Sequence, residues 1–240
     1  YNGWACTLTI DSAGTLADVT AIVKATTAGT FTTDSDKIVT LTTSADTTVT
    51  ATTASSVFVT SGGQATVTAN AATAVSVTAT EEAFITANAA NTVTFSTGDG
   101  IDTTSASAIA STLTSTNANN ITVNVSGRAA ATVVDLSGAA NVTTVNVSGT
   151  QNVTVRVGLV GIDGIGTTTS TLLDDNLFVV NNTNTGTTNL FIKTTGGDGD
   201  FSSANVNSIV VGADLGPLDD LTIASGALVV TAFDQTNDLD

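Results

Sequence analysis

The chain has 240 residues, 41% of them hydrophobic, and carries 21 acidic against five basic side chains, a formal net charge of −16. Five scattered bases cannot neutralise a row of phosphates, which excludes nucleic acid as a partner and argues against attraction to an anionic membrane surface. No apolar run approaches the roughly 18 residues that a membrane span needs.

The chain lacks most of the residue types on which catalysis depends. There is no His, so a Ser-His dyad or a His-ligated metal is excluded, and the single cysteine, Cys6, has no partner base. A pair of carboxylates is the remaining option, as in a sugar-cleaving β-helix. Such enzymes need a cleft with aromatic platforms, whereas aromatic residues make up 4% of this chain. We therefore expect no enzymatic activity.

Residues 1–20 are predicted to form an N-terminal cap or to continue from missing sequence. Polar and apolar residues alternate from Cys6 to Ile10, which is typical of a strand. Cys6 is either a small buried hydrophobe or the partner of a cysteine in another chain. Because the chain begins at Tyr1 and contains no Met, we expect a processed product or an internal piece of a longer polypeptide.

Short apolar triplets recur on a fixed period between residues 21 and 97. One series begins at Val39 and a second at Val49, and within each series successive triplets start 18 residues apart. The gaps between the two series alternate as 10 and 8 residues, which indicates two strands in each 18-residue coil. Stepping back by 18 places the start of the array near residue 21. The triplets of the two series start at Val39, Val57, Val75 and Val93, and at Val49, Val67 and Ile85.

The alternation within each triplet predicts which side chains are buried. The outer members are apolar and the central one is usually Thr or Ser, so the outer members point inward and the central one outward. One coil cannot bury its own apolar residues, but stacked coils bury them against each other, as in a β-solenoid. Val67 is then expected to lie between Val49 and Ile85. An ordinary β-sandwich with evenly spaced strands is the alternative.

The pattern changes after residue 97. Residues 98–119 are predicted to be a joint, and residues 120–158 a second array, in which strands at Val123, Val134 and Val145 step by 11 residues. This step fits either half of a 22-residue coil or one wall of a larger coil. Glycines after the strands are expected to supply the positive φ of a tight corner. These glycines are Gly127, Gly138 and Gly149.

Residues 159–240 are predicted to be an irregular β region with Asp/Gly turns. Apolar strand-like runs persist there, but no fixed spacing links them. The whole chain is thus predicted to be all-β, a β-solenoid of the parallel β-helix or β-roll type. An 18-residue-coil array is followed by an 11-residue-step array and an irregular C-terminal part.

Two Asp/Gly stretches suggest calcium sites. Calcium takes six to eight oxygens, and an Asp/Gly turn offers carboxylates together with backbone carbonyls that glycine can turn inward. The alternative is that Asp and Gly occupy these turns for conformational reasons alone. The candidate ligand turns contain Gly98, Asp99, Gly100 and Asp102, and Gly197, Asp198, Gly199 and Asp200.

The same stretches carry a family resemblance. Residues 97–102 and 196–200 resemble the Gly-x-Gly-x-Asp part of RTX repeats, and residues 142–149 resemble units of RTX-type bacterial surface-layer (S-layer) proteins. The resemblance implies an extracellular, cell-surface protein that binds Ca²⁺ in its turns and assembles with copies of itself. Cell-surface polysaccharide is a second partner that it implies. The chain lacks tandem Gly-Gly-x-Gly-x-Asp runs, so isolated calcium sites are expected and not a calcium-filled roll.

Asn-x-Ser/Thr sequons allow two interpretations. Each is a potential glycan acceptor in a secreted protein. Alternatively, the asparagines line up on the solenoid and their amides hydrogen-bond from coil to coil. The sequons begin at Asn120, Asn124, Asn141, Asn146, Asn152 and Asn181.

Three functions fit this sequence. The first is a structural, self-assembling protein of a surface layer or filament, because a solenoid presents repeated contacts to its own copies. The second is a binding module such as an adhesin stalk or phage fibre. The third is ice binding by a flat Thr array, in which Thr48, Thr50 and Thr52 stack over Thr66 and Thr68. Three residues are expected to interrupt that array after two rows, namely Asn70, Phe84 and Asn88.

Overall fold

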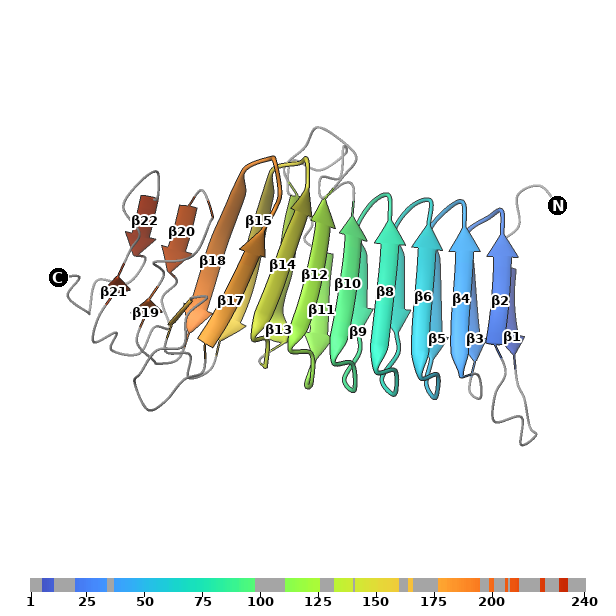
Figure 1. The fold of residues 1–240 in the computed structure, drawn as a ribbon. Helices are drawn as coiled ribbons and strands as arrows, with labels where there is room; N and C mark the ends of the chain where they lie inside the picture. The colour runs from blue at the N-terminus through green and yellow to red at the C-terminus, as the bar shows by residue number, and fades with distance from the viewer. Residues whose placement is uncertain are drawn as a thin grey trace.

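The protein is an elongated stack of β-coils. Within the described residues every regular element is a β-strand, and neighbouring strands pair in parallel. Figure 1 shows the strands side by side along one axis, with the N-terminal strands at one end of the stack. No helix in this part of the chain is long and apolar enough to cross a membrane. The computed structural model describes residues 6–10, 20–33, 37–97, 111–125, 132–139, 141–159, 164–165, 177–194, 199–200, 206, 208–211, 221–222 and 229–232.

The strands form two sheets, which are the two walls of the solenoid. In the first coils, consecutive strands lie alternately in one sheet and in the other. Sheet A contains, in spatial order, β1 (Cys6–Ile10), β3 (Gly29–Thr33), β5 (Thr47–Ala51), β7 (Ala65–Thr68), β9 (Ala83–Thr86), β11 (Ser111–Ser115), β13 (Thr132–Ala139), β15 (Val153–Leu159), β18 (Thr188–Thr194), β20 (Ser208–Val211) and β22 (Val229–Ala232). Sheet B contains β2 (Thr20–Ala25), β4 (Ile38–Thr43), β6 (Ser56–Ser61), β8 (Ala74–Ala79), β10 (Thr92–Thr97), β12 (Asn120–Val125), β14 (Thr144–Gly149), β17 (Leu177–Asn182), β16 (Gly164–Ile165), β19 (Gly199–Asp200) and β21 (Leu221–Thr222).

Strand pairing confirms the 18-residue coil and the β-solenoid. In sheet A, Val67 of β7 pairs with Val49 of β5 on one side and with Ile85 of β9 on the other. The array begins where the period places it, since Ala21 pairs with Val39 in sheet B. The parallel ladders exclude the alternative β-sandwich, which is built from antiparallel sheets.

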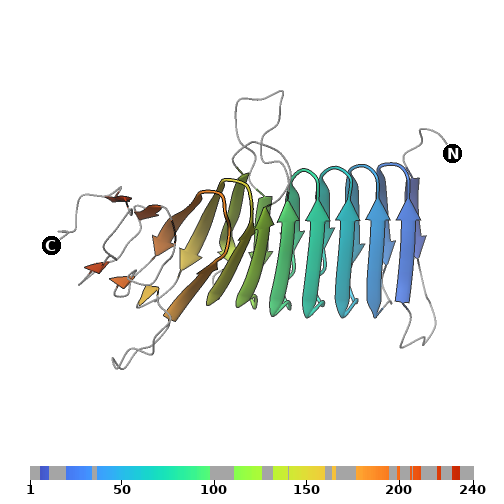
Figure 2. The ribbon, with the colours of Figure 1, turned by 45° about the horizontal axis from the view of Figure 1, so that its top comes forward.

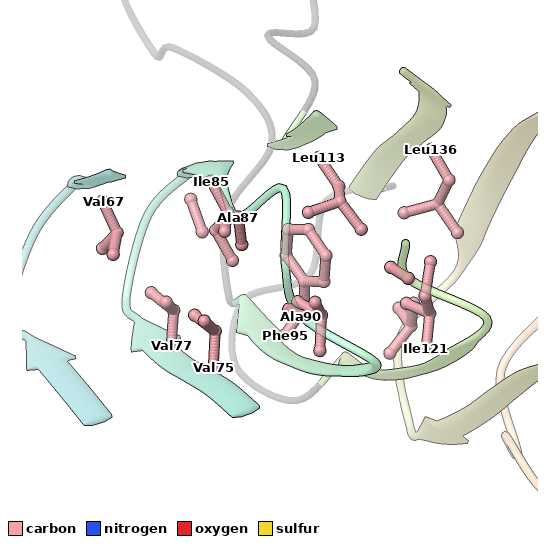
Figure 3. Packing of buried hydrophobic residues seen from close by; sticks show 14 of the residues in the cluster. Val67, Val75, Val77, Ile85, Ala87, Ala90, Phe95, Leu113, Ile121 and Leu136 are labelled. Carbon is pink, nitrogen blue, oxygen red and sulfur yellow. The ribbon is translucent and has the colours of Figure 1, made fainter. Parts of the chain in front are cut away.

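Apolar side chains from both sheets fill a narrow interior. Val67, Ile85 and Leu113 come from sheet A, whereas Val77 and Phe95 come from sheet B, and all are buried. Figure 3 shows these side chains directed toward one another across the space between the two walls. Most interior positions are Val or Ala, so the walls lie close together and each coil is buried largely by the coils on either side.

The corners are stacked by hydrogen bonds from each coil to the one before it. The Ser55 hydroxyl donates to the Lys37 carbonyl at 2.6 Å, and the Thr73 hydroxyl donates to the Ser55 carbonyl at 3.2 Å. Buried hydroxyls serve the inner side of other corners, where Ser115 Oγ donates to the Ala87 carbonyl at 2.7 Å. Because buried backbone carbonyls need partners, Ser and Thr at the corners let tight turns stack without unsatisfied groups.

Coil length changes after β10, although the sheets continue. Thr92 pairs with Asn120, 28 positions on, so this coil is ten residues longer than those before it. The strand β11 lies within the stretch predicted to be a joint and pairs with both β9 and β13, which carries sheet A through it. The division of the chain into separate domains at 98–119 stays a prediction.

The 11-residue step is half of a coil. Val123 lies in sheet B, Val134 in sheet A and Val145 in sheet B again, so successive motifs alternate between the walls. The register differs from the motif alignment, because Val145 pairs with Ile121 and not with Val123. The coil from β12 to β14 is therefore 24 residues long, two more than a strict 22-residue period would give.

One of the three predicted corner glycines has the expected conformation. Gly149 has a φ of 125°, and a Cβ atom there would overlap the carbonyl of Val125. The prediction is wrong for Gly138, which lies inside β13 beside a register shift against β11 and leaves room for the Leu113 carbonyl. Gly127 lies outside the described residues.

The two halves of the stack differ in flatness. The strands from β2 to β10 run side by side with little change of direction, whereas the strands from β13 onward are inclined to them (Figures 1 and 2). The flat half is the part with the constant 18-residue coil. Identical coil lengths let each strand lie directly over the previous one, which keeps the outer faces of this half regular.

Candidate functional site

The predicted calcium ligands fall mostly outside the described residues, and these are Gly98, Asp99, Gly100, Asp102, Gly197 and Asp198. The other two, Gly199 and Asp200, form β19, whose backbone pairs with β16 and β21. This two-residue strand places their backbone in sheet B and does not test whether they are ligands. Among the described residues, no group of three or more His, Cys, Asp or Glu side chains is placed to hold a metal ion. The calcium sites stay a prediction.

Acidic side chains of the flat half gather at one corner of the coils. Asp46, Gln64 and Glu82 occupy equivalent positions 18 residues apart. The Gln64 backbone N–H donates to Asp46 Oδ1 at 2.9 Å, and its side-chain amide donates to Glu82 Oε2 at 3.3 Å. A neutral amide thus lies between the two carboxylates, where an acidic residue would place three carboxylates in consecutive coils. This arrangement lowers the repulsion within the corner and explains how Glu82 remains with 5% of its surface exposed.

The two outer faces are uncharged from β3 to β12. None of the strands from β3 to β12 contains an Asp, Glu, Lys or Arg residue. The acidic residues of this half that the structure describes, Asp46, Glu81 and Glu82, lie between strands. Over strands β3 to β12 the strongly acidic chain therefore presents a neutral face on each sheet and confines its described charges to the corners.

The outer face of sheet A carries two columns of threonine. One column runs through Thr30, Thr48, Thr66, Phe84 and Thr112, and the other through Thr32, Thr50, Thr68, Thr86 and Thr114. Nine of these ten outward positions are therefore Thr. We call these ten positions the threonine face.

The sequence-based expectation that this array ends after two rows is wrong. Asn70 and Asn88 were expected to interrupt it, but they follow the ends of β7 and β9 and lie in turns. Only Phe84 interrupts a column. The row at Thr30 and Thr32 was detectable by stepping back 18 residues. The row at Thr112 and Thr114 was not, because the longer coil breaks the period.

Sheet B carries an asparagine ladder on its outer face. Asn146 Nδ2 donates to Asn120 Oδ1 at 2.9 Å, and Asn181 Nδ2 donates to Asn146 Oδ1 at 2.8 Å. The amides thus bond from coil to coil, which confirms the structural interpretation of these sequons. Two other sequon asparagines are also engaged, since Asn141 Nδ2 donates to the Thr116 carbonyl and Asn152 Oδ1 accepts from the Thr187 N–H.

We expect Asn146→Ala to lower the free energy of unfolding by about 1 kcal/mol, which is the usual net contribution of one hydrogen bond. The substitution removes both ladder bonds, but water can reach the amides left on Asn120 and Asn181, which are exposed. Urea titration followed by circular dichroism measures the change. Asn124→Ala on β12 is the matched control, and an equal loss in the two variants would show that the ladder does not stabilise the fold.

Comparison with protein-family models, curated proteins and solved structures finds no match. Any function proposed for this chain therefore rests on the arrangement of the described residues alone. It offers uncharged, regular outer faces, a ladder of amides and an acidic corner.

Proposed function

We propose that the chain is a structural, self-assembling extracellular protein, a subunit of a surface layer or filament. The observation that carries this proposal is the absence of charged residues from strands β3 to β12 in a chain of net charge −16. Like charges resist association, and here the regular sheet faces are free of them. Copies can approach through these faces while the acidic corners keep single molecules soluble.

Calcium is the second part of the proposal. Bringing many copies together concentrates the remaining acidic residues, and divalent cations bound at Asp/Gly turns would relieve the repulsion. The sequence at residues 97–102 and 196–200, which resembles RTX repeats, supports this role. An ion that binds only the ordered form stabilises it by RT ln(1 + [L]/Kd), about 2.7 kcal/mol at a hundredfold excess over Kd. Extracellular modules bind calcium at about 10⁻⁴ to 10⁻³ M, so several sites are needed at millimolar calcium.

The test is negative-stain microscopy of the purified chain in millimolar calcium, with magnesium at the same concentration as the control. We expect ordered sheets or fibres with calcium. On adding chelator we expect particle size to fall while the β-sheet circular dichroism signal persists, because the 39–95 array has its own buried core.

Each other outcome contradicts a different part of the proposal. Dispersed rods in calcium would exclude self-assembly and favour the alternative of an adhesin stalk or phage fibre. Assemblies that survive chelation would retain the structural role but show that calcium does not hold the copies together.

A further inference from the structure

The threonine face has a geometry that the proposed structural role does not require. Its five strands pair in parallel without a register shift from β3 to β11. The threonines of neighbouring strands are therefore about 4.8 Å apart, and the two columns about 6.7 Å apart. The face is a rectangular net of side chains repeated in two directions. The backbone of β1 continues the register by one row, since Thr7 and Thr9 pair with Thr30 and Thr32.

The hydroxyls of this net are unused within the described structure. None of the nine threonines makes a side-chain hydrogen bond to a protein group, whereas Ser and Thr residues at the corners, such as Ser55 and Thr73, donate to backbone carbonyls. Each hydroxyl is thus available to water as both donor and acceptor. The methyl group beside it is apolar, and the β-branched side chain has restricted χ1 freedom. The face therefore offers fixed polar points on an otherwise apolar and uncharged surface.

A protein partner fits this face poorly. Five rows and two columns at these spacings cover roughly 300 Å². A stable protein interface buries about 800 Å² on each partner, so the net alone is too small. A different protein finds no charged side chain on this net to recognise, and copies of this chain would associate through the wider sheet faces and not through the net alone.

Ice fits the face better, because ice is itself a periodic lattice of hydrogen-bonding groups. The two spacings of the net are close to the repeat distances between oxygen rows on a prism face of hexagonal ice. Water bonded to the hydroxyls and ordered over the methyl groups can thus adopt lattice positions. We propose that the threonine face binds the surface of ice crystals.

The opposite sheet provides an internal comparison. At the ten equivalent positions of β4, β6, β8, β10 and β12, six residues are Thr and the others are Phe, Ser and Asn. Sheet B therefore has the same backbone spacing without the continuous net. Thr60 and Thr78 are exposed on its outer face and match Thr50 and Thr68 in residue type and neighbouring-coil position.

The test measures thermal hysteresis and the incorporation of the protein into a growing ice hemisphere, at a concentration where light scattering shows single particles. The unmodified chain is expected to show both. Thr50→Lys/Thr68→Lys should lose most of the activity, because two long charged side chains break both directions of the net. Thr60→Lys/Thr78→Lys on sheet B should retain it. Phe84→Thr should raise the ice-binding activity, because it completes the column. A gain of activity cannot be caused by misfolding, so this variant controls for that explanation of the losses.

Two results would overturn the inference. One is an unmodified chain without hysteresis that ice excludes as it grows. The other is an equal loss of activity in the sheet A and sheet B double variants. Neither result bears on assembly in calcium, which the microscopy measures separately.

Discussion

Val67→Asp is expected to lower the free energy of unfolding by about 4 kcal/mol or more, the range reached when an unpaired charge is buried. Val67 has 1% of its surface exposed and lies between Val49 and Ile85 in sheet A. None of the strands from β3 to β12 contains a Lys or Arg residue that could pair with a buried carboxylate. Urea titration of the unmodified and substituted chains measures the difference.

The effect should depend on pH with a definite sign. Burial raises the pKa of the introduced carboxyl above its unfolded value of about 3.9, because the charged form is disfavoured in an apolar interior. The variant is therefore least destabilised below pH 4, where the group is neutral in both states. It loses further stability as the pH rises through the folded-state pKa.

Thr68→Asp is the matched control, since its side chain points to the outer face one residue further along β7. A substitution on the surface usually changes stability by about 0.5 kcal/mol or less. Comparable losses for the two variants would contradict the assignment of inward and outward positions, and with it the 18-residue register.

The period predicted the flat half because each coil there has the same length. Constant length places Val49, Val67 and Ile85 at the same point of successive coils, so spacing alone identifies strand, face and neighbour. The sequons predicted that Asn amides bond from coil to coil, but the repeated unit did not identify the members of the ladder. Only Asn146 lies in an Asn-Val-Ser/Thr unit, whereas Asn120 and Asn181 precede Ile-Thr and Asn-Thr.

Coils of variable length could not be predicted in this way. Ten additional residues precede Asn120, and no local signal in residues 98–110 shows that β11 rejoins sheet A beside β9. A solenoid can extend a corner without disturbing its core, because each coil contacts only its neighbours. The extent of the threonine face was missed for this reason, as Thr112 and Thr114 follow the longer coil.

The second large effect is expected at Phe95, which is fully buried where the coil length changes. It pairs with Val77 in β8 and with Val123 in β12, so it belongs to both the constant and the variable part of sheet B. Figure 3 shows its ring in the interior between the two walls, and Leu113 of the facing sheet belongs to the same buried cluster. This large ring therefore fills an interior made mainly of Val and Ala and links the two walls.

Phe95→Ala should lower the free energy of unfolding by about 3 to 5 kcal/mol, the range for removing a buried aromatic ring. The loss should lie near the upper end, because the neighbouring strands are fixed by ladders on both sides and cannot collapse into the cavity. The urea midpoint should fall, and amide exchange should accelerate most in β8, β10 and β12. Phe58→Ala is the control, since Phe58 is 43% exposed on the outer face of β6 and its removal opens no cavity. If both variants unfolded at the same urea concentration, Phe95 would not be what holds the two walls together at this coil.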